Sequence, residues 1–327
     1  MKKFVWEIVA ILMLVTGLFV GLTTQAVLAR ETVTIEDIHG KQEVMVMPER
    51  VAALDNRTFA TLADWDVKLV AAPKAIMSKD NPYVEDESIV DIGNHREPDF
   101  ESLVAADPQV VIVGQRFASH YDTIKELLPE AVIIDFSWDV TQSGDKTGTN
   151  LINMLKESTR NLGQLFNKEK EADQLVADFD EAMAQVKEAY PTNAKVMGLI
   201  TTGGEMGYSA AGTGRLWGPL FQIFNMQEAL TLEKSGSNHQ GEDISVEAIA
   251  QANPDILLVL DRDAALSSVD NAVPAQEIIE QAPALKEVTA VKEGHILYAP
   301  QDTYLNESIQ TFTQLFKDMA NMMATMK

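Results

Sequence analysis

Arginines stand out in this chain because acidic residues dominate it. The sequence has 26 Lys and Arg against 49 Asp and Glu, and its formal net charge is -23 at pH 7. Three arginines, Arg116, Arg215 and Arg262, stand beside the ends of predicted strands or helices. A guanidinium is permanently charged and offers several planar donors, so three that converge favour a ligand with several negative charges. The alternative is that each arginine pairs with a carboxylate and stabilises its own part of the fold.

Four more side chains belong to the candidate site. Arg57 follows the first predicted strand, and Arg96 lies beside His95 in a loop, so each either faces the same ligand or is a solvated loop charge. His239 lies in a loop rich in Gly, Ser and Asn, and Tyr304 lies in the loop before the last predicted helix. Arg215 itself is expected at the start of a helix, where the free backbone N–H groups also favour an anion.

Two stretches of the chain, residues 101–118 and 247–264, match without a gap at a constant offset of 146. Each contains a short helical segment, a Pro preceded by Asp107 or Asn253, an apolar run and then an arginine. This order predicts a helix, a turn and a buried strand, with Arg116 or Arg262 just beyond the strand. The coincidence of breaker, apolar run and arginine indicates a duplicated architecture.

The two copies flank one long predicted helix, residues 167–190, whose apolar residues recur at intervals of three and four. Asn167 is the expected N-cap and Pro191 the stop signal, so the helix has about 23 residues and a length of roughly 35 Å. We expect it to act as a strut that joins two Rossmann-like α/β lobes, lies outside both cores and leaves a ligand cleft between the lobes. The expected segments are a signal peptide at 1–29, a first lobe at 30–150, connecting helices at 151–191 and a second lobe at 192–327.

The remaining patterns complete two βα lobes. Alternation around His39 and Gly40 predicts a hairpin over 33–47, with His39 at the surface of the turn. His120 is also expected at the surface, on the helix that follows Arg116. Further predicted strands cover 50–55, 69–72, 131–136, 195–201 and 296–298, and further predicted helices cover 58–65, 151–166, 215–224 and the C-terminus.

The N-terminus has the pattern of an export signal. Lys2 and Lys3 precede an apolar run, residues 8–22, and the small residues Val27 and Ala29 stand where a signal peptidase reads. The run is short of the ~20 residues of a spanning helix, although an uncleaved anchor that begins nearer Phe4 is the alternative. The chain has no cysteine, so it has neither a disulfide nor a site for a lipid anchor. We expect a free periplasmic protein whose acidity disfavours nucleic acid and anionic membranes.

Several segments in the same order resemble the periplasmic substrate-binding proteins of iron-siderophore ABC importers, of the class III type with a helical backbone. The nearest branch is the enterobactin/petrobactin (catecholate) type. The resemblance covers about residues 33–325, and the segments that carry it are 49–70, 97–116, 161–166, 212–221, 239–262 and 298–308. Its individual motifs are loose, but their order and spacing are specific.

This resemblance implies a function and a set of roles. The protein would capture a ferric siderophore, with Fe(III) as cargo and no intrinsic cofactor, and deliver it to an ABC permease dimer in the inner membrane. Arg116, Arg215 and Arg262 would hold the ferric catecholate. His239 and Tyr304 would complete the iron shell when the siderophore supplies only four donors. The tyrosine loop, QDTYL at 301–305, is less aromatic here than in the family.

The repeat adds a second pair of candidates, Glu101 and Glu247, which occupy the same place in both copies. Each falls in the first turn of a predicted helix, where a carboxylate also stabilises the helix by interacting with its dipole. In the family that the chain resembles, one glutamate per lobe at this place contacts the permease. We therefore expect a symmetric docking pair on a monomer.

Other functions give different sequence expectations. A haem or cobalamin carrier shares the fold, and composition does not distinguish it. A bare-metal (Mn/Zn) binding protein needs three or four convergent His and carboxylate ligands, whereas the five histidines stand in unlike local contexts. An enzyme needs a nucleophile with its base, and neither a G-x-S-x-G elbow nor a metal-hydrolase helix is present, so we expect a binding protein.

Overall fold

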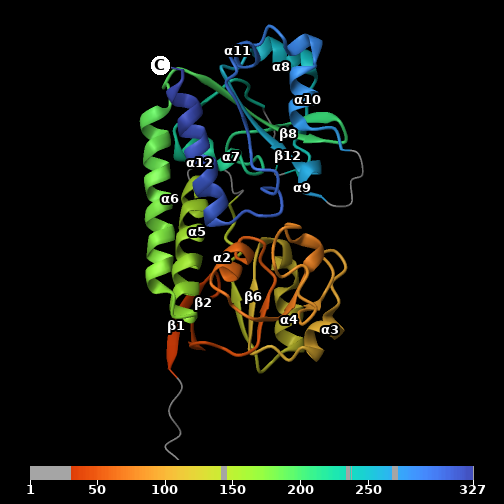
Figure 1. Cartoon of the computed structure of the whole chain (residues 1–327), viewed down its shortest axis with the longest axis vertical. Coiled ribbons are helices and arrows are strands. Elements are labelled where there is room, and N and C mark those ends of the chain that lie inside the picture. The colour runs from red at the N-terminus through yellow and green to blue at the C-terminus, as the bar shows by residue number, and fades with distance from the viewer. Residues whose placement is uncertain (1–30, 141–145, 233–235, 237, 267–271, 327) are drawn as a thin grey trace, which may run out of the picture. The chain divides into compact units, whose positions relative to one another are not determined.

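A computed structural model describes residues 31–140, 146–232, 236, 238–266 and 272–326, and within it residues 32–327 form one compact unit. The predicted signal peptide, 1–29, lies outside the described residues. Among the helices of the described ranges, none is both long enough and apolar enough to cross a membrane. Two α/β lobes follow each other along the chain, with a layer of long helices beside them (Figure 1).

The first lobe is built on a parallel sheet with the strand order β5-β4-β3-β6-β7. The chain reverses direction across the sheet between β3 and β6, and in open α/β sheets ligands bind beyond the carboxyl ends of the strands at this place. Arg57 follows β3 and Arg116 follows β6, so the topology brings both arginines to the switch point. The strands are β3 (Val51–Ala53), β4 (Leu69–Ala72), β5 (Val90–Asp91), β6 (Val110–Val113) and β7 (Val132–Asp135).

Short helices connect these strands. They are α2 (Phe59–Asp64), α3 (Phe100–Ala105), α4 (Tyr121–Leu127) and the 3-10 turns Lys74–Ile76 and Gln115–His120. Ahead of the sheet, β1 (Thr32–Asp37) and β2 (Gly40–Met45) form the predicted hairpin. His39 is more than turn surface, because its ring stacks on Tyr121 at 3.8 Å and its Nε2 lies 3.1 Å from Asp135 Oδ2. The hairpin is thereby tied to the end of β7.

The second lobe has a mixed sheet in the order β11-β9-β8-β12-β13, with β10 also paired to β8. The strands are β8 (Lys195–Thr202), β9 (Glu205–Ser209), β10 (Gln227–Glu228), β11 (Glu242–Asp243), β12 (Ile256–Asp261) and β13 (Ile296–Tyr298). The sequence did not predict β9, because its glycines suggested only turns. Gly203 and Gly204 do form the tight turn, with positive φ, but the residues after them pair antiparallel with β8.

The duplication is confirmed down to its caps. Asp99 and Ser245, which are 146 residues apart, accept hydrogen bonds at the first turns of α3 and α8 (Val246–Ala252). Asp107 and Asn253, at the same offset, both adopt left-handed backbone with φ of 47° and 44° before their prolines. The strands β6 and β12 follow with buried apolar residues. The remaining helices of the second lobe are α7 (Gly218–Ile223), α9 (Arg262–Ala265), α10 (Ala275–Glu280), the 3-10 turn Pro283–Leu285 and α11 (Thr289–Glu293).

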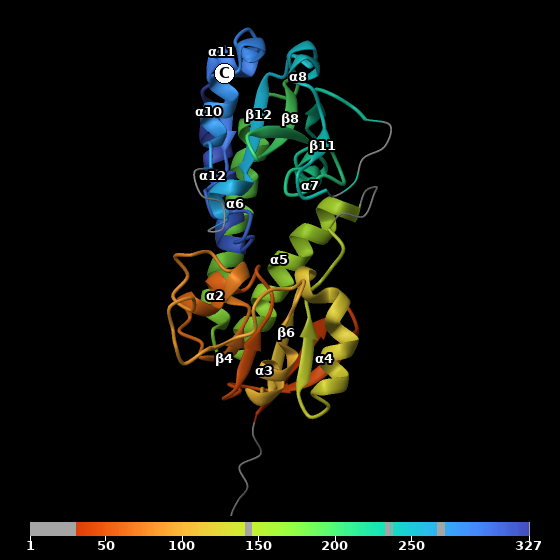
Figure 2. The same cartoon turned by 90° about the vertical axis from the view of Figure 1, so that its right-hand side faces the viewer.

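Three long helices, α5 (Lys146–Leu165), α6 (Glu169–Ala189) and α12 (Ile309–Ala324), pack beside the lobes (Figures 1 and 2). The predicted long helix is thus α6, but two details of the prediction are wrong. Asn167 is not its N-cap, because it adopts left-handed backbone (φ 52°) in the turn after α5, and Lys168 precedes the helix. Nor does α6 lie outside the cores, because its apolar stripe joins the core of the second lobe and Ala172 joins that of the first.

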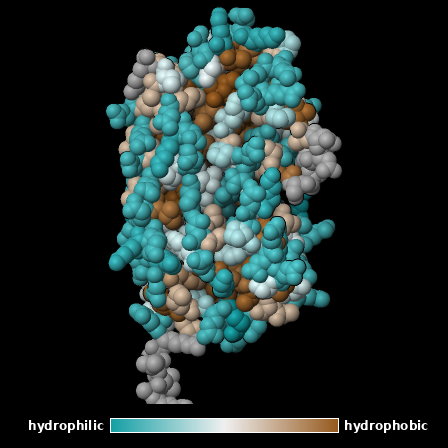
Figure 3. All heavy atoms as spheres, in the orientation of Figure 1, coloured by the Kyte–Doolittle hydropathy of each residue, from teal (hydrophilic) through white to brown (hydrophobic). Residues whose placement is uncertain are grey.

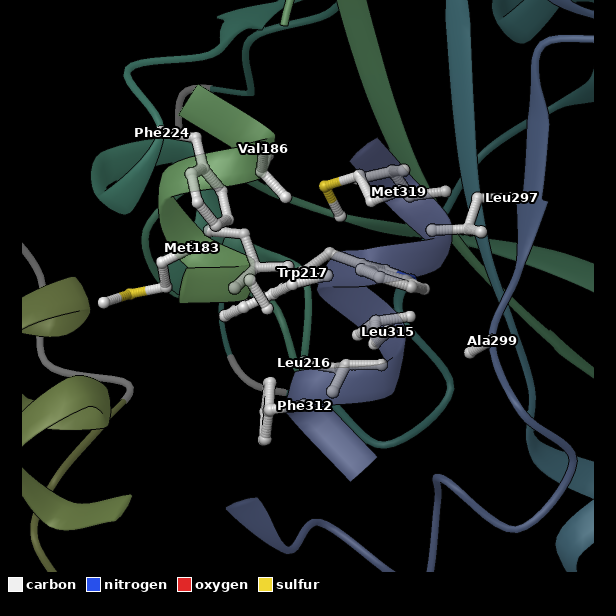
Figure 4. Close-up of a cluster of buried hydrophobic side chains, with 14 of the residues drawn as sticks. Met183, Val186, Leu216, Trp217, Phe224, Leu297, Ala299, Phe312, Leu315 and Met319 are labelled. Atoms are coloured by element: carbon white, nitrogen blue, oxygen red, sulfur yellow. The ribbon is translucent and has the colours of Figure 1, made fainter. Parts of the chain in front are cut away.

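Trp217 lies at the centre of the core between α6, α7 and α12 (Figure 4). Its side chain is fully buried, and its indole N–H donates to the carbonyl of Leu199 in β8 at 3.1 Å. Met183, Phe312 and Leu315 belong to the same cluster. A well-packed aromatic residue two positions after Arg215 fixes the backbone that carries this arginine.

The outer surface carries most of the charge. Figure 3 shows hydrophilic residues over most of the face that it displays. The exposed large hydrophobic side chains of the described ranges are Ile38, Met47, Val90, Val104, Leu127 and Val273. The acidic residues therefore lie mostly at the surface of the lobes, whereas several arginines are buried or half-buried.

Candidate functional site

Three arginines from both lobes surround one aromatic ring. The guanidinium carbons of Arg116, Arg215 and Arg262 lie 5.4, 4.5 and 5.3 Å from the centre of the Tyr304 ring. Arg116 and Arg215 also donate to the Tyr304 carbonyl oxygen at 3.0 and 3.3 Å. The convergence predicted for these arginines is therefore present, and each cation lies within the range of a cation–π contact.

Each arginine is positioned by a different local structure. Arg116 lies in the 3-10 turn after β6, and Arg262 opens α9 after β12, as the repeat predicts. Arg215 does not start a helix, because α7 begins only at Gly218 and has six residues. Instead Arg215 precedes Leu216, whose φ is 61°, in a turn held by a hydrogen bond from the Ser209 hydroxyl to the Arg215 carbonyl at 2.8 Å. The prediction of an anion-binding helix terminus at Arg215 is therefore wrong.

The site contains two carboxylates that sequence reasoning missed. Glu307 pairs with both Arg57 and Arg215, and all three side chains are at most 7% exposed. Asp263 pairs with Arg262 and accepts hydrogen bonds from the Thr202 hydroxyl and the Gly203 N–H. Asp263 directly follows Arg262, and Glu307 lies three residues after Tyr304, but nothing in the sequence pattern shows that the two carboxylates turn inward.

Arginine charge shapes the titration of Tyr304 and His239. Burial would raise the pKa of Tyr304, but the charges of Arg215, Arg116 and Arg262 outweigh it and lower that pKa. Burial, followed by the same three charges, lowers the pKa of His239. The Tyr304 hydroxyl lies 3.4 Å from His239 Nδ1, and Arg215 approaches the same nitrogen at 3.2 Å. Both shifts are toward the forms that bind a metal, which are the phenolate and the neutral imidazole.

A cleft of about 410 Å³ opens over this cluster and is lined from both lobes. Its volume is typical of small-molecule sites. Its polar lining residues are Asn94, His95, Arg96, Arg116, His239, Arg262 and Tyr304. Arg96 is exposed at the rim, whereas burial and the charges of Arg116 and Arg96 lower the pKa of His95 to about 4. The expected cleft is therefore present, and its histidines remain uncharged at neutral pH.

Arg57 lies behind the cleft rather than in it. Its side chain is 3% exposed and donates to Gln115 Oε1 at 2.9 Å and to Glu307 Oε2 at 3.2 Å. A smaller cavity of about 130 Å³ adjoins this pair and shares His239 with the cleft. This buried position is not that of a solvated loop charge, and Arg57 lines the smaller cavity.

The sequence matches the family model described as periplasmic binding protein over residues 51–303, most of the chain. The chain belongs to the periplasmic binding protein family. Petrobactin-binding protein YclQ of Bacillus subtilis (strain 168) is 26% identical over 276 residues, which cover 83% of this chain and 81% of YclQ. Ferric-anguibactin-binding protein FatB of Vibrio anguillarum (strain ATCC 68554 / 775) is 27% identical over 273 residues, with the same coverage of each chain.

Solved structures show the same two-lobed α/β fold. The siderophore binding protein BauB, bound to a complex between two molecules of acinetobactin and ferric iron, has a TM-score of 0.75 at 24% identity over 90% of this chain and 99% of BauB. The crystal structure of YclQ has a TM-score of 0.73 at 22% identity, with the same coverage of each chain. These similarities confirm the predicted architecture of a periplasmic binding protein.

Within this family fold, metal-binding side chains are sparse. Over the described ranges, no three His, Cys, Asp or Glu side chains converge as a metal site would require. In the cleft, His239 Nδ1 and the Tyr304 hydroxyl bring two potential ligands within 3.4 Å of each other.

Glu101 and Glu247 lie where the repeat predicts, each at the second position of its helix, α3 or α8. Both side chains are exposed. Figures 1 and 2 place α3 and α8 at the far ends of the two lobes, away from the cleft. Their positions thus suit contacts with a partner and not with a ligand between the lobes.

Asp55 provides a test of the electrostatics behind the site. It is buried just after β3, and burial raises its pKa to about 7 from the usual 3.8, even though the Arg57 charge acts in the opposite direction. A Cβ at Gly114 would overlap the Asp55 carboxylate, so the end of β6 approaches it as closely as glycine allows. The folded protein therefore keeps a proton that the unfolded chain has lost between these two values, and native stability falls as pH rises across this window.

We expect Asp55→Asn to remove this loss of stability at rising pH, because the asparagine side chain resembles the protonated carboxyl group. Relative to the parent, the variant should gain roughly 1 kcal/mol in unfolding free energy for each pH unit between about 4 and 7. Urea unfolding at several pH values measures the difference. A difference that does not change with pH would contradict the assignment.

Proposed function

We propose that this chain is an extracytoplasmic binding protein that captures an anionic ferric siderophore, of the catecholate type, and delivers it to an ABC importer permease. The observation that carries the proposal is the group of three arginines around Tyr304, two of which, Arg116 and Arg262, line a cleft between the lobes. The names of YclQ, FatB and BauB, which specify siderophores, support it.

Charge supports the class of ligand. Arg96, Arg116 and Arg262 line the cleft, and Arg57 and Arg215 line the smaller cavity behind it. The carboxylates paired with these arginines are Glu307 and Asp263, so positive charges exceed negative ones by three in this group of seven side chains. A ferric ion bound by three catecholates is a trianion, so its charge matches this excess. In a protein that is otherwise strongly acidic, such a cleft also excludes cations.

The experiment compares ligands of the three alternative classes. The mature protein is titrated with a ferric tris-catecholate, with haem, with cobalamin, and with Mn²⁺ or Zn²⁺. Intrinsic fluorescence reports binding because Trp217 is two residues from Arg215. We expect the ferric catecholate to bind at least tenfold more tightly than the others. Tighter binding of haem, cobalamin or the bare ion would refute the proposed ligand class.

We further propose that His239 and Tyr304 bind iron directly when a siderophore supplies only four donors. The lowered pKa values of both groups and their 3.4 Å separation support adjacent positions on one ion. Phenolate and imidazole ligation should shift the visible absorption band of a four-donor ferric complex and leave that of a six-donor complex unchanged. His239→Ala and Tyr304→Phe should abolish this shift of the absorption band. If both variants show the same shift as the parent protein, direct ligation is ruled out.

The proposed location and partners follow from the same function. Residues 1–29 act as a signal peptide that exports a monomer to the periplasm, where Glu101 and Glu247 dock the two lobes on a permease dimer. N-terminal sequencing of the exported protein tests the cleavage after Ala29.

A further inference from the structure

Glu307 connects the two lobes through one buried carboxylate. It lies in the short segment between Tyr304 and α12. One of its oxygens pairs with Arg57, which follows β3 in the first lobe, and the other pairs with Arg215, which follows β9 in the second. Each of the three side chains is at most 7% exposed. The carboxylate is therefore shared by one cation behind the cleft and one cation beside the Tyr304 ring.

This carboxylate stays ionised although it is buried. Burial would raise the pKa of Glu307, but the charges of Arg215, Arg57 and Arg116 lower it below its usual value. Removing a buried pair's negative partner would leave two guanidinium groups facing each other without compensation. Glu307 thus keeps a permanent negative charge close to the site where an anion is expected.

The charge of Glu307 matters because the electrostatic potential in a cleft determines how strongly the binding free energy depends on the charge of the ligand. Two ligands of the same shape that differ by one charge differ in binding free energy by an amount proportional to that potential. A buried charge is weakly screened by salt, so a single carboxylate at this place has a larger effect than one on the surface.

We propose that Glu307 is the counter-charge that sets the electrostatic potential of the cleft, and thereby its preference between ligands of equal shape and different charge. It is a positioning residue that acts through Arg215 and does not touch the ligand. The inference rests on the proposed function, because it takes a metal tris-catecholate as the ligand.

The test uses two complexes that share a six-oxygen shell. Gallium(III) tris-catecholate is a trianion, and germanium(IV) tris-catecholate is a dianion of nearly the same shape. The quantity measured is the ratio of the dissociation constant of the dianion to that of the trianion, at fixed pH and salt. Glu307→Gln should raise this ratio about threefold or more, because the potential becomes more positive. Arg57→Gln should lower the ratio, because Glu307 then loses one of its two cations.

Two further variants separate charge from structure. The double variant Arg57→Gln with Glu307→Gln restores the net charge of the cluster, so its ratio should return to the wild-type value even if both affinities fall. Asp180→Asn removes a carboxylate of another ion pair, with Lys156 between α6 and α5, and should leave the ratio unchanged. It matches Glu307→Gln in total charge.

The outcomes distinguish the two proposals. If neither complex binds the wild-type protein, the proposed function fails and the inference fails with it. If both complexes bind but Glu307→Gln and Arg57→Gln change the ratio in the same direction, or not at all, only the role of Glu307 is refuted. Opposite changes in the single variants with recovery in the double variant support it, since a merely structural role would not produce that pattern.

Discussion

Replacing Arg116, Arg215 or Arg262 by alanine should each weaken the binding of a ferric tris-catecholate by tenfold or more. Each guanidinium provides charge-assisted hydrogen bonds, for which a loss of about 1.5–3 kcal/mol is typical. Arg215 should show the largest effect, because its removal also leaves Glu307 with one cation fewer beside an anionic ligand. The variant that lacks all three should show no measurable binding.

Matched controls are available among arginines outside the cleft. Arg50 and Arg160 form exposed ion pairs with Asp107 and Asp173. Arg50→Ala and Arg160→Ala change the net charge equally and should leave affinity within about twofold, because exposed pairs contribute little. Fluorescence titration measures the affinity of all six variants. Unchanged affinity in all three cleft variants would refute the proposed site.

Reversing Glu101 and Glu247 to lysine should abolish uptake while the protein still binds its ligand. The two side chains are exposed at equivalent places on α3 and α8, at the far ends of the lobes. A two-fold related permease would present two equivalent basic sites to them, and like charges at such contacts are strongly unfavourable. Each reversal removes a favourable helix-dipole interaction of about 0.3–1 kcal/mol, so stability should fall only slightly.

The control for this reversal is a second glutamate pair in the first turn of a helix. Glu169 and Glu171 are exposed at the start of α6, and reversing both changes the net charge by the same amount. This control should keep uptake and association with the permease. Transport of labelled ferric siderophore, pull-down of the permease, and ligand titration report the three properties. Transport that survives the double reversal at Glu101 and Glu247, or ligand binding lost with it, would contradict the docking role.

The sequence was informative wherever a local pattern determines the structure. The repeat predicts α3 with β6 and α8 with β12, because breakers, apolar runs and caps act over a few residues. It also places Arg116 and Arg262 just beyond their strands, where parallel sheets bind ligands. The long helix α6 follows from its stripe and from Pro191, although Asn167 caps nothing because the turn after α5 holds it in left-handed backbone.

The remainder depends on contacts between distant segments. Glu307 lies 250 residues from Arg57 in sequence, so no local pattern shows that the two side chains meet. The apolar residues between Leu216 and Phe224 predict a helix that starts at Arg215, whereas Leu216, with a φ of 61°, bends the chain before α7 begins. The antiparallel strand β9 was not predicted, because the glycines in and around it are equally compatible with turns. In each case tertiary packing selects one of several local conformations that the sequence allows.

The central claim is that the arginines around Tyr304 hold a ferric complex, and anomalous diffraction tests it most directly. Crystals of the mature protein grown with a ferric tris-catecholate are measured on both sides of the iron absorption edge. We predict one iron peak in the cleft, with catecholate oxygens within hydrogen-bonding distance of Arg116, Arg215 and Arg262. An iron peak outside the cleft, or a complex in the cleft that none of these three arginines contacts, would contradict the account.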